Sequence, residues 1–251
     1  MKKPLSKLFI GILALSSVFL ASCSNGSGAK LHVRDFLGDT NTVSEIKHDE
    51  EYDVDYRDIR VNAYFGSSDD YLPVNAVYSD DVFFKPSTEY NHFLARMSMG
   101  SALASYTVDG GMAEDGGADA FNYFIQCGFE NPRMDEYFQE TSLYTVASLI
   151  SAKKIQKGTE EATVVAVSVR SGKYGKEWMS NFNVESGYEE HLGFSRAADL
   201  VVDRTMSYVN QHHISGNIKF WVAGFSRGAA ISNLIAARLN NTFRSCCRLW
   251  S

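Results

Sequence analysis

The sequence predicts an α/β fold with a parallel sheet, and the second half of the chain carries the pattern. Residues 162–169 (ATVVAVSV) form a dense apolar run, which is typical of a strand buried on both faces of a sheet. An amphipathic helix from Gly193, an apolar strand at 218–223 (IKFWVA) and an apolar helix at 228–239 follow in order. Strand, helix, strand and helix in succession favour parallel strands with helices packed on the sheet.

The first 22 residues are expected to be a secretory signal peptide. Three lysines precede a short apolar run, and small residues follow it. The run is too short for a comfortable membrane span. Residues 20–23 (LASC) resemble the lipobox of bacterial lipoproteins, which implies cleavage before Cys23 and lipid attachment to it. An ordinary signal peptide with an incidental cysteine is the alternative.

Residues 23–50 are polar and mixed in charge, so we expect a flexible linker that holds the folded part away from a bilayer. Cleavage after residue 22 would remove three lysines and no acidic residue, which lowers the formal net charge from −6 to −9. This balance argues against nucleic acid as a partner and against electrostatic binding to anionic lipid. Membrane association would therefore depend on acyl chains at Cys23, on an extracytoplasmic membrane surface.

Residues 51–157 are expected to form an N-terminal region that mixes strands and helices. Its expected elements are strands at 54–65 and 72–84, a helix at 87–108, a loop at 109–119 and helices at 118–129 and 141–155. The last helix is predicted because apolar residues recur at helical spacing, at Leu143, Val146, Ala147 and Ile150. Ser87 or Thr88 is expected to cap the helix at 87–108.

Neither the cysteines nor the acidic segments indicate a metal site, and no cofactor is expected. Cys127 lies in an apolar segment, which favours a buried free thiol. The adjacent Cys246 and Cys247 lack metal-ligand spacing with any histidine. The Asp-rich breaks at 66–70 and 78–81 lack the spacing of an EF-hand loop, so solvated turns are preferred there.

The stretch GFSRG at 224–228 matches G-x-S-x-G and is the main candidate site. An apolar strand enters it and an apolar helix leaves it directly, the context in which this pattern presents a nucleophilic serine. Ser226 would be the nucleophile, and the backbone N–H of Arg227 would donate to a developing oxyanion. Side chains at Gly224 or Gly228 would collide with neighbouring backbone. A tight glycine-rich turn without chemistry is the alternative.

A second oxyanion donor is expected at the turn that leaves the strand at 162–169. α/β-Hydrolases take this donor from a loop after an earlier strand. Arg170-Ser171-Gly172 is a polar, glycine-containing turn in that place, so Ser171 and Gly172 are the candidate donors. An ordinary turn at a strand end is the alternative.

Four motifs, in order along the chain, resemble those of the fungal-type (class 3) lipases. They are the turn Arg170-Ser171-Gly172, Trp178, the segment His191-Leu192-Gly193-Phe194 and the elbow at 224–228. The resemblance covers about residues 144–240 and implies an α/β-hydrolase fold, with residues 158–240 as the N-terminal half of the lipase-like domain. It also implies hydrolysis of an acyl ester or lipid through an acyl-enzyme on Ser226, without metal or cofactor.

The chain departs from the family pattern at three positions. Ser171 and Gly172 stand in the reverse of the usual order, and Phe225 replaces the His or Tyr that usually precedes the serine. His191 matches a family position that is not the catalytic base, so a structural role is expected for it.

The residues after Ser226 lack the partners that a nucleophilic serine needs. In this fold the acid and then the base follow the nucleophile along the chain, but residues 227–251 contain no Asp, Glu or His. His212 and His213 precede the strand at 218–223 and should lie at the opposite end of the sheet. We therefore expect a truncated or frameshifted chain, with an atypical tail at 241–251 and impaired or absent activity.

Two rival classes of protein stay open. One is a non-catalytic surface lipoprotein that uses the hydrolase fold for binding. The other is a peptidase or acyltransferase built on the same scaffold.

Overall fold

The computed structural model describes residues 44–64, 71–106, 113–137, 142–170, 179–183 and 190–248. The chain divides into two compact units, Met1–Asn41 and Thr42–Ser251, and every described residue belongs to the second. The expectations for the signal peptide, Cys23, Ser171, Gly172 and Trp178 fall outside the described residues. Among the helices of the described part, none is long and apolar enough to cross a membrane.

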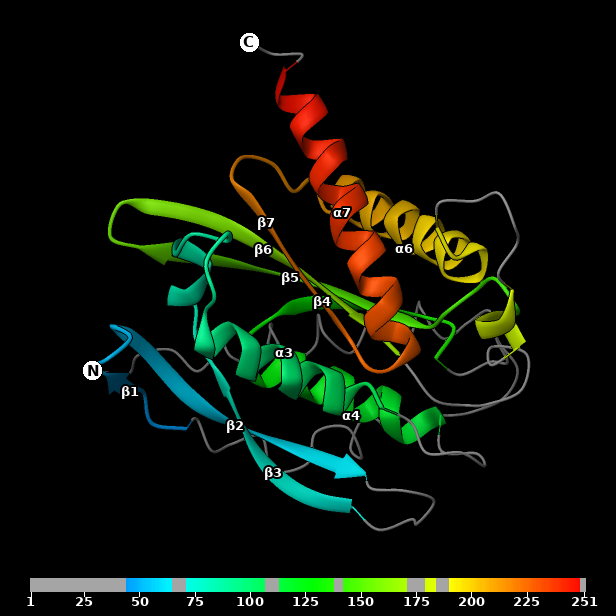
Figure 1. Cartoon of the computed structure of the whole chain (residues 1–251). Coiled ribbons are helices and arrows are strands. Elements are labelled where there is room, and N and C mark those ends of the chain that lie inside the picture. The colour runs from blue at the N-terminus through cyan, green and yellow to red at the C-terminus, as the bar shows by residue number, and fades with distance from the viewer. Residues whose placement is uncertain are drawn as a thin grey trace, which may run out of the picture. The chain divides into compact units, whose positions relative to one another are not determined.

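A four-stranded sheet forms the centre of the fold, in the order β4-β5-β6-β7 (Figure 1). Its strands are β4 (Glu130–Asp135), β5 (Ser148–Lys157), β6 (Glu160–Val169) and β7 (Ile218–Gly224). β4, β5 and β6 pair antiparallel, whereas β6 and β7 pair parallel. The α/β class is thus confirmed, but the sheet is mixed rather than parallel throughout.

The helix predicted at 141–155 is wrong, because Ser148–Lys157 form β5 instead. The first four residues of β5 are all buried, so the strand has no apolar and polar alternation there that would reveal it. The turn between β5 and β6 does leave a signal in the sequence. Lys157 pairs with Glu160 across a two-residue turn, and Gly158 in that turn has a φ of +60°, which glycine adopts easily.

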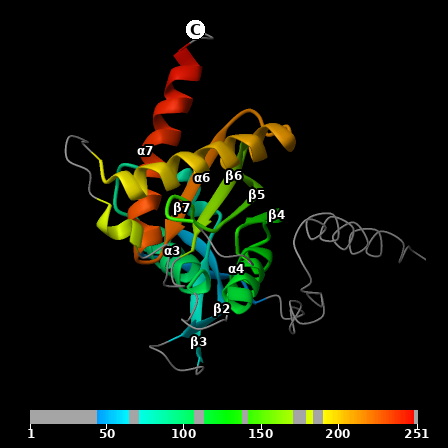
Figure 2. The ribbon, with the colours of Figure 1, turned by 90° about the vertical axis from the view of Figure 1, so that its right-hand side faces the viewer.

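Helices cover both faces of this sheet (Figures 1 and 2). α6 (Leu192–Gln211) and α7 (Arg227–Arg248) pack on one face, and α3 (His92–Ala104) and α4 (Ala113–Gln126) pack on the other. The first face is built on the valines of β6, which meet aliphatic residues of α6 and α7 in one buried cluster. These valines are Val165, Val167 and Val169. α7 continues past Asn240, through most of the segment 241–251 that we expected to be an atypical tail.

The N-terminal region contributes a second, three-stranded antiparallel sheet. It consists of β1 (Lys47–Asp49), β2 (Val54–Tyr64) and β3 (Tyr71–Tyr78), followed by a short 3₁₀ helix, η1 (Asp81–Phe84). The two strands predicted there are confirmed, although the second ends at Tyr78. β1 lies within the segment expected to be a linker and pairs with β2.

Two details of the N-terminal helices differ from the sequence predictions. Asn91 caps α3, since its side chain accepts a hydrogen bond from the Leu94 N–H at 3.0 Å, and not Ser87 or Thr88. α4 begins at Ala113, inside the Gly- and Asp-rich stretch that we expected to be a loop.

Trp221 of β7 joins the two sheets through an aromatic cluster. Its indole is 4% exposed, and its N–H donates to Ser98 Oγ of α3 at 3.0 Å. Five other aromatic rings lie with their centroids 5.6–6.4 Å from the indole, namely Tyr78, Phe83, Tyr123, Phe124 and Phe129. The strand that leads into the G-x-S-x-G turn is therefore anchored to the N-terminal region.

Candidate active site

Ser226 occupies the turn between β7, which ends at Gly224, and α7, which begins at Arg227. Its φ is +50°, in the left-handed region that residues other than glycine rarely adopt. The Ser226 carbonyl accepts the N–H groups of Ala229 and Ala230 at 3.0 and 3.3 Å, so the helix fixes this conformation. The side chain is exposed. G-x-S-x-G enzymes present their nucleophilic serine on a strained strand-to-helix turn of the same kind.

The two glycines of the turn have no room for side chains, as the sequence predicted. A Cβ on Gly224 would lie 2.6 Å from the carbonyl carbon and oxygen of Gly228 and 2.8 Å from Ser232 Oγ. A Cβ on Gly228 would lie 2.5 Å from Val169 O and 2.8 Å from Arg170 O. The turn is therefore packed against the end of β6.

The parallel pairing of β6 and β7 places the end of β6 beside the serine turn. Val169 is the register partner of Gly224, so the chain leaves both strands at the same edge of the sheet. Arg170 is the last described residue before Ser171 and Gly172, the two candidate donors. Val169 and Arg170 thus lie against Gly228 of the serine turn.

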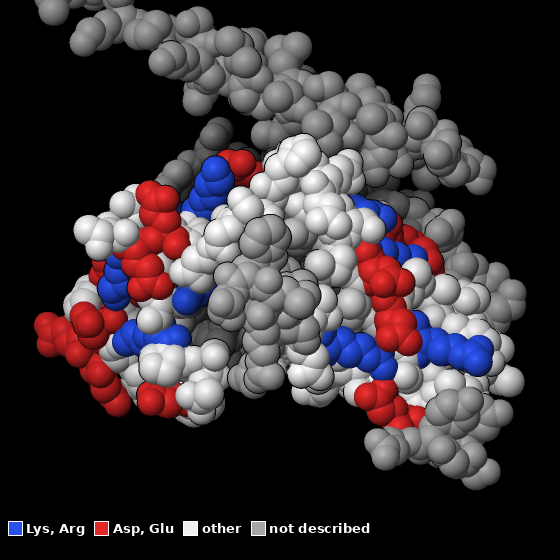
Figure 3. Space-filling view, turned by 90° about the horizontal axis from the view of Figure 1, so that it is seen from above, with Lys and Arg blue, Asp and Glu red and all other residues white. Residues whose placement is uncertain are grey.

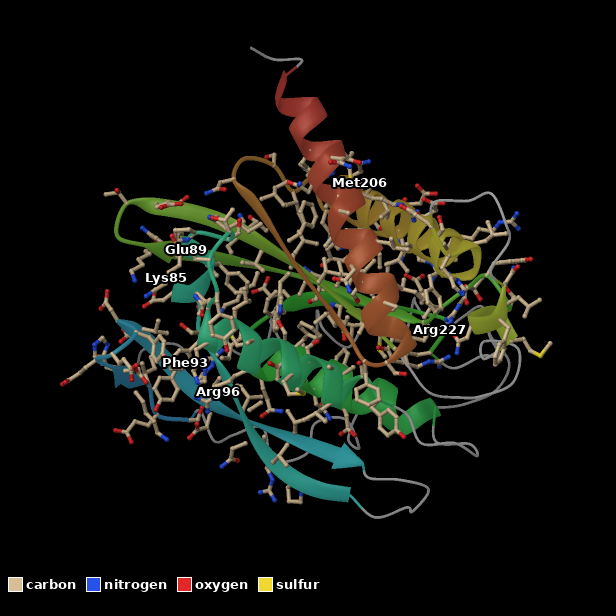
Figure 4. The ribbon with its side chains drawn as sticks, viewed as in Figure 1. Lys85, Glu89, Phe93, Arg96, Met206 and Arg227 are labelled. Atoms are coloured by element: carbon tan, nitrogen blue, oxygen red, sulfur yellow. The ribbon has the colours of Figure 1, made fainter. Side chains whose placement is uncertain are left out.

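Arg227 ties the start of α7 to two neighbouring segments (Figure 4). Its guanidinium lies near Thr145 O, with Nη1 and Nη2 at 3.4 and 3.5 Å, and 6.0 Å from the centre of the Phe194 ring. The side chain is largely buried, at 8% exposure. Its backbone N–H belongs to the first turn of the helix, where N–H groups have no intrahelical acceptor and favour negative charge.

Phe225 brings the N-terminal region to the serine turn. Its ring packs edge-on against Tyr106, with the centroids 4.8 Å apart. Tyr106 follows the end of α3 and was missed by sequence reasoning, because nothing near it in the sequence indicates a contact with so distant a part of the chain. The aromatic pair forms an apolar surface beside Ser226.

None of the described histidines is hydrogen-bonded to the Ser226 side chain. His191 precedes α6, where its Nε2 lies 3.0 Å from Asn181 O and its ring stacks on Phe194 at 4.0 Å, which supports a structural role. His212 and His213 lie between α6 and the first residue of β7, whereas Ser226 follows the last. Seven strand residues separate the two ends by about 20 Å. The opposite-end prediction is therefore confirmed.

The surroundings of His212 suit a neutral ring. Burial, followed by the nearby charges of Arg133 and His213, lowers the pKa of His212 below its usual value. Within the described part of the chain, the side chain of Ser226 makes no hydrogen bond, and no group of His, Cys, Asp and Glu residues could hold a metal ion.

Charged side chains on the surface mix both signs (Figure 3). Arg238 of α7, for example, pairs with Asp199 at 3.0 Å and with Glu190 at 2.5 Å. Exposed pairs of this kind contribute about 0–1 kcal/mol each.

Comparison of the chain with protein-family models, with curated proteins and with solved structures finds no match. The geometry around Ser226 is therefore the main indication of function in the described residues.

Proposed function

We propose that the protein is a serine hydrolase of the lipase or carboxylesterase type, with an α/β-hydrolase fold, that acts on acyl esters. The observation that carries this proposal is the backbone of Ser226. An exposed serine at φ +50° sits between strand β7 and the N-terminus of α7, with Gly224 and Gly228 packed too closely for side chains. Strained non-glycine conformations of this kind persist where the surrounding structure enforces them, and they concentrate at active sites.

The proposed reaction proceeds through an acyl-enzyme. Ser226 Oγ forms a bond to the ester carbonyl carbon, and the serine proton passes to the departing alkoxide, which leaves as an alcohol. The Arg227 N–H stabilises the oxyanion of the tetrahedral intermediate, with Ser171 or Gly172 as the candidate second donor. Water then attacks the acyl carbon, and the carboxylic acid leaves Ser226.

The reaction is expected to be slow in this chain. A serine without a base is a weak nucleophile at neutral pH, and residues 227–251 contain no Asp, Glu or His. Enzymes that lose a triad residue still retain about 10³–10⁴-fold catalysis over water from the oxyanion site and binding. An activated ester has a leaving group that departs without a general acid, so we expect it to acylate Ser226 slowly but detectably and the acyl group to be released more slowly still.

The rival proposal is a surface lipoprotein that binds a ligand without chemistry. It is favoured by the lack of any hydrogen bond from the Ser226 side chain to a described residue. In both proposals Cys23 carries the lipid that attaches the protein to an extracytoplasmic membrane surface, with an acyl ester or lipid as the small-molecule partner.

A panel of nitrophenyl esters tests the catalytic proposal, with Ser226→Ala as the diagnostic variant. Ser207→Ala is the matched control, since Ser207 is an exposed serine on α6. We expect the wild-type chain and Ser207→Ala to acquire one acyl group by mass, and Ser226→Ala to acquire none. An acyl adduct on Ser226→Ala equal to that on the wild-type chain, or no adduct on the wild-type chain, would remove the catalytic proposal. Cleavage of peptide substrates, or acyl transfer to added alcohols, would instead indicate a peptidase or an acyltransferase.

A further inference from the structure

Arg170 is a fully buried arginine at the point where the chain leaves β6. Its residue exposure is 0%, and it is the largest fully buried side chain of the described part. Burying a guanidinium costs several kcal/mol unless it is well hydrogen-bonded. Because Arg170 lies beside the serine turn, the contacts of its guanidinium affect how that turn is held in place.

The guanidinium holds the segment that follows β4. Arg170 Nη1 donates to Tyr137 O at 3.1 Å and to Glu136 O at 3.5 Å. The guanidinium carbon also lies 5.7 Å from the centre of the Tyr137 ring, which is itself fully buried. On the backbone side, the Arg170 N–H donates to Ala147 O at 3.0 Å.

A second arginine fixes the same segment from the other side. Arg204 of α6 forms an ion pair with the Glu136 carboxylate, and its Nη1 donates to Val146 O at 3.0 Å. Both side chains of the pair are largely buried. Residues 136–137 therefore form a rigid support, anchored to α6, on which the Arg170 side chain rests.

The backbone of Arg170, in contrast to its side chain, lies against the serine turn. Its carbonyl oxygen and that of Val169 leave no space for a Cβ on Gly228. A continuous set of contacts thus runs from α6 through Arg204 and Glu136 to Arg170, and from the Arg170 backbone to the turn that holds Ser226.

We infer that Arg170 is a positioning residue that fixes the end of β6 against Gly228, and with it the serine turn that carries Ser226 and the Arg227 N–H donor. This inference rests on the proposed function. Oxyanion donors act only when they lie within about 2.7–3.1 Å of the developing charge, and a displacement of about 1 Å can cost about 10²-fold in rate. A buried guanidinium with fixed acceptors resists that displacement better than an apolar side chain.

The test separates positioning from stability by measuring the reaction of Ser226 with a fluorophosphonate. Arg170→Met is expected to lower the inactivation rate constant kinact by about 10²-fold, while KI changes less than about 2-fold. Arg170→Lys retains one donor that can reach Tyr137 O, so its kinact should lie between those of the wild type and Arg170→Met. Arg170→Lys also tests the positioning role if Arg170→Met does not fold.

Lys153→Met is the matched control. Lys153 is a half-buried cation of β5 that pairs with Asp80 at 2.7 Å, and its register partner is Val164, five residues before Val169. This variant should lower the Tm without lowering kinact. Either of two results would overturn this inference and leave the proposed function standing. One is a wild-type kinact in Arg170→Lys or Arg170→Met, and the other is an equal loss of kinact in Lys153→Met. An unlabelled wild-type Ser226 would instead refute the proposed function, and the inference with it.

Discussion

Replacing Gly228 with alanine would add a methyl group where the serine turn meets the end of β6. The new Cβ would lie 2.5 Å from Val169 O and 2.8 Å from Arg170 O. Ordinary contact needs about 3.5 Å, so the turn has to retreat by about 1 Å. Overpacking of this kind costs about 1–3 kcal/mol, which lowers Tm by about 2–4 °C per kcal/mol in a domain of this size. The same displacement should slow acylation of Ser226 by about 10²-fold.

Thermal unfolding and fluorophosphonate labelling, measured on the same preparation, check both parts of this prediction. Gly216→Ala is the control, because a Cβ there meets nothing within 4 Å, while the φ of +83° strains an alanine. That strain costs about 1–3 kcal/mol, so the control should lose stability comparably but keep the wild-type labelling rate. Wild-type labelling of a destabilised Gly228→Ala would show that the contact with β6 does not position Ser226.

Three further predictions concern residues outside the serine turn. Trp221→Ala should lower the free energy of unfolding by about 3–5 kcal/mol, because the indole fills the aromatic cluster between the sheets. Urea denaturation followed by circular dichroism measures this change, and a loss below about 1 kcal/mol would contradict the packing role of the indole. Burial raises the pKa of the Cys127 thiol, so iodoacetamide at pH 8 should leave Cys127 unmodified until the protein is unfolded in urea; rapid modification of folded protein would contradict the buried position. Cys23→Ser should abolish incorporation of radiolabelled palmitate in a bacterial host, and unchanged incorporation would exclude the lipobox interpretation.

The unit β6-α6-β7-α7 could be predicted because its signals are local. Four valines in residues 162–169 and the 3.6-residue period of α6 and α7 are each visible in a short window of sequence. The steric role of Gly224 and Gly228 follows from the turn geometry alone. The geometry of the serine turn is therefore the part of the candidate site that the sequence predicts best.

The rest of the site depends on contacts between distant segments. β5 was mistaken for a helix because Leu143, Val146, Ala147 and Ile150 recur at helical spacing by coincidence, although Ile150 is buried inside a strand. The Phe225–Tyr106 ring pair joins the turn to α3, far away in the chain. Such contacts leave no local periodicity, so only the folded chain reveals them.

Arg170 illustrates the same limit in a different way. The sequence placed it in a turn and drew attention to the two residues after it, because their backbone could donate to an oxyanion. An arginine directly after a dense apolar strand is the one signal that could have indicated burial, yet arginine is ordinarily an exposed residue. Its acceptors, the carbonyls of Glu136 and Tyr137, could be found only from the fold.

Peptide mapping after fluorophosphonate treatment shows whether Ser226 is the reactive nucleophile. Trypsin cleaves after Lys219 and Arg227, so the product 220–227 (FWVAGFSR) carries Ser226 as its only serine. The account predicts a phosphonate adduct on this peptide in the folded protein, with no adduct after urea unfolding or in Ser226→Ala. A folded protein whose 220–227 peptide stays unmodified after prolonged exposure to excess fluorophosphonate, while a control serine esterase is labelled completely, would contradict it.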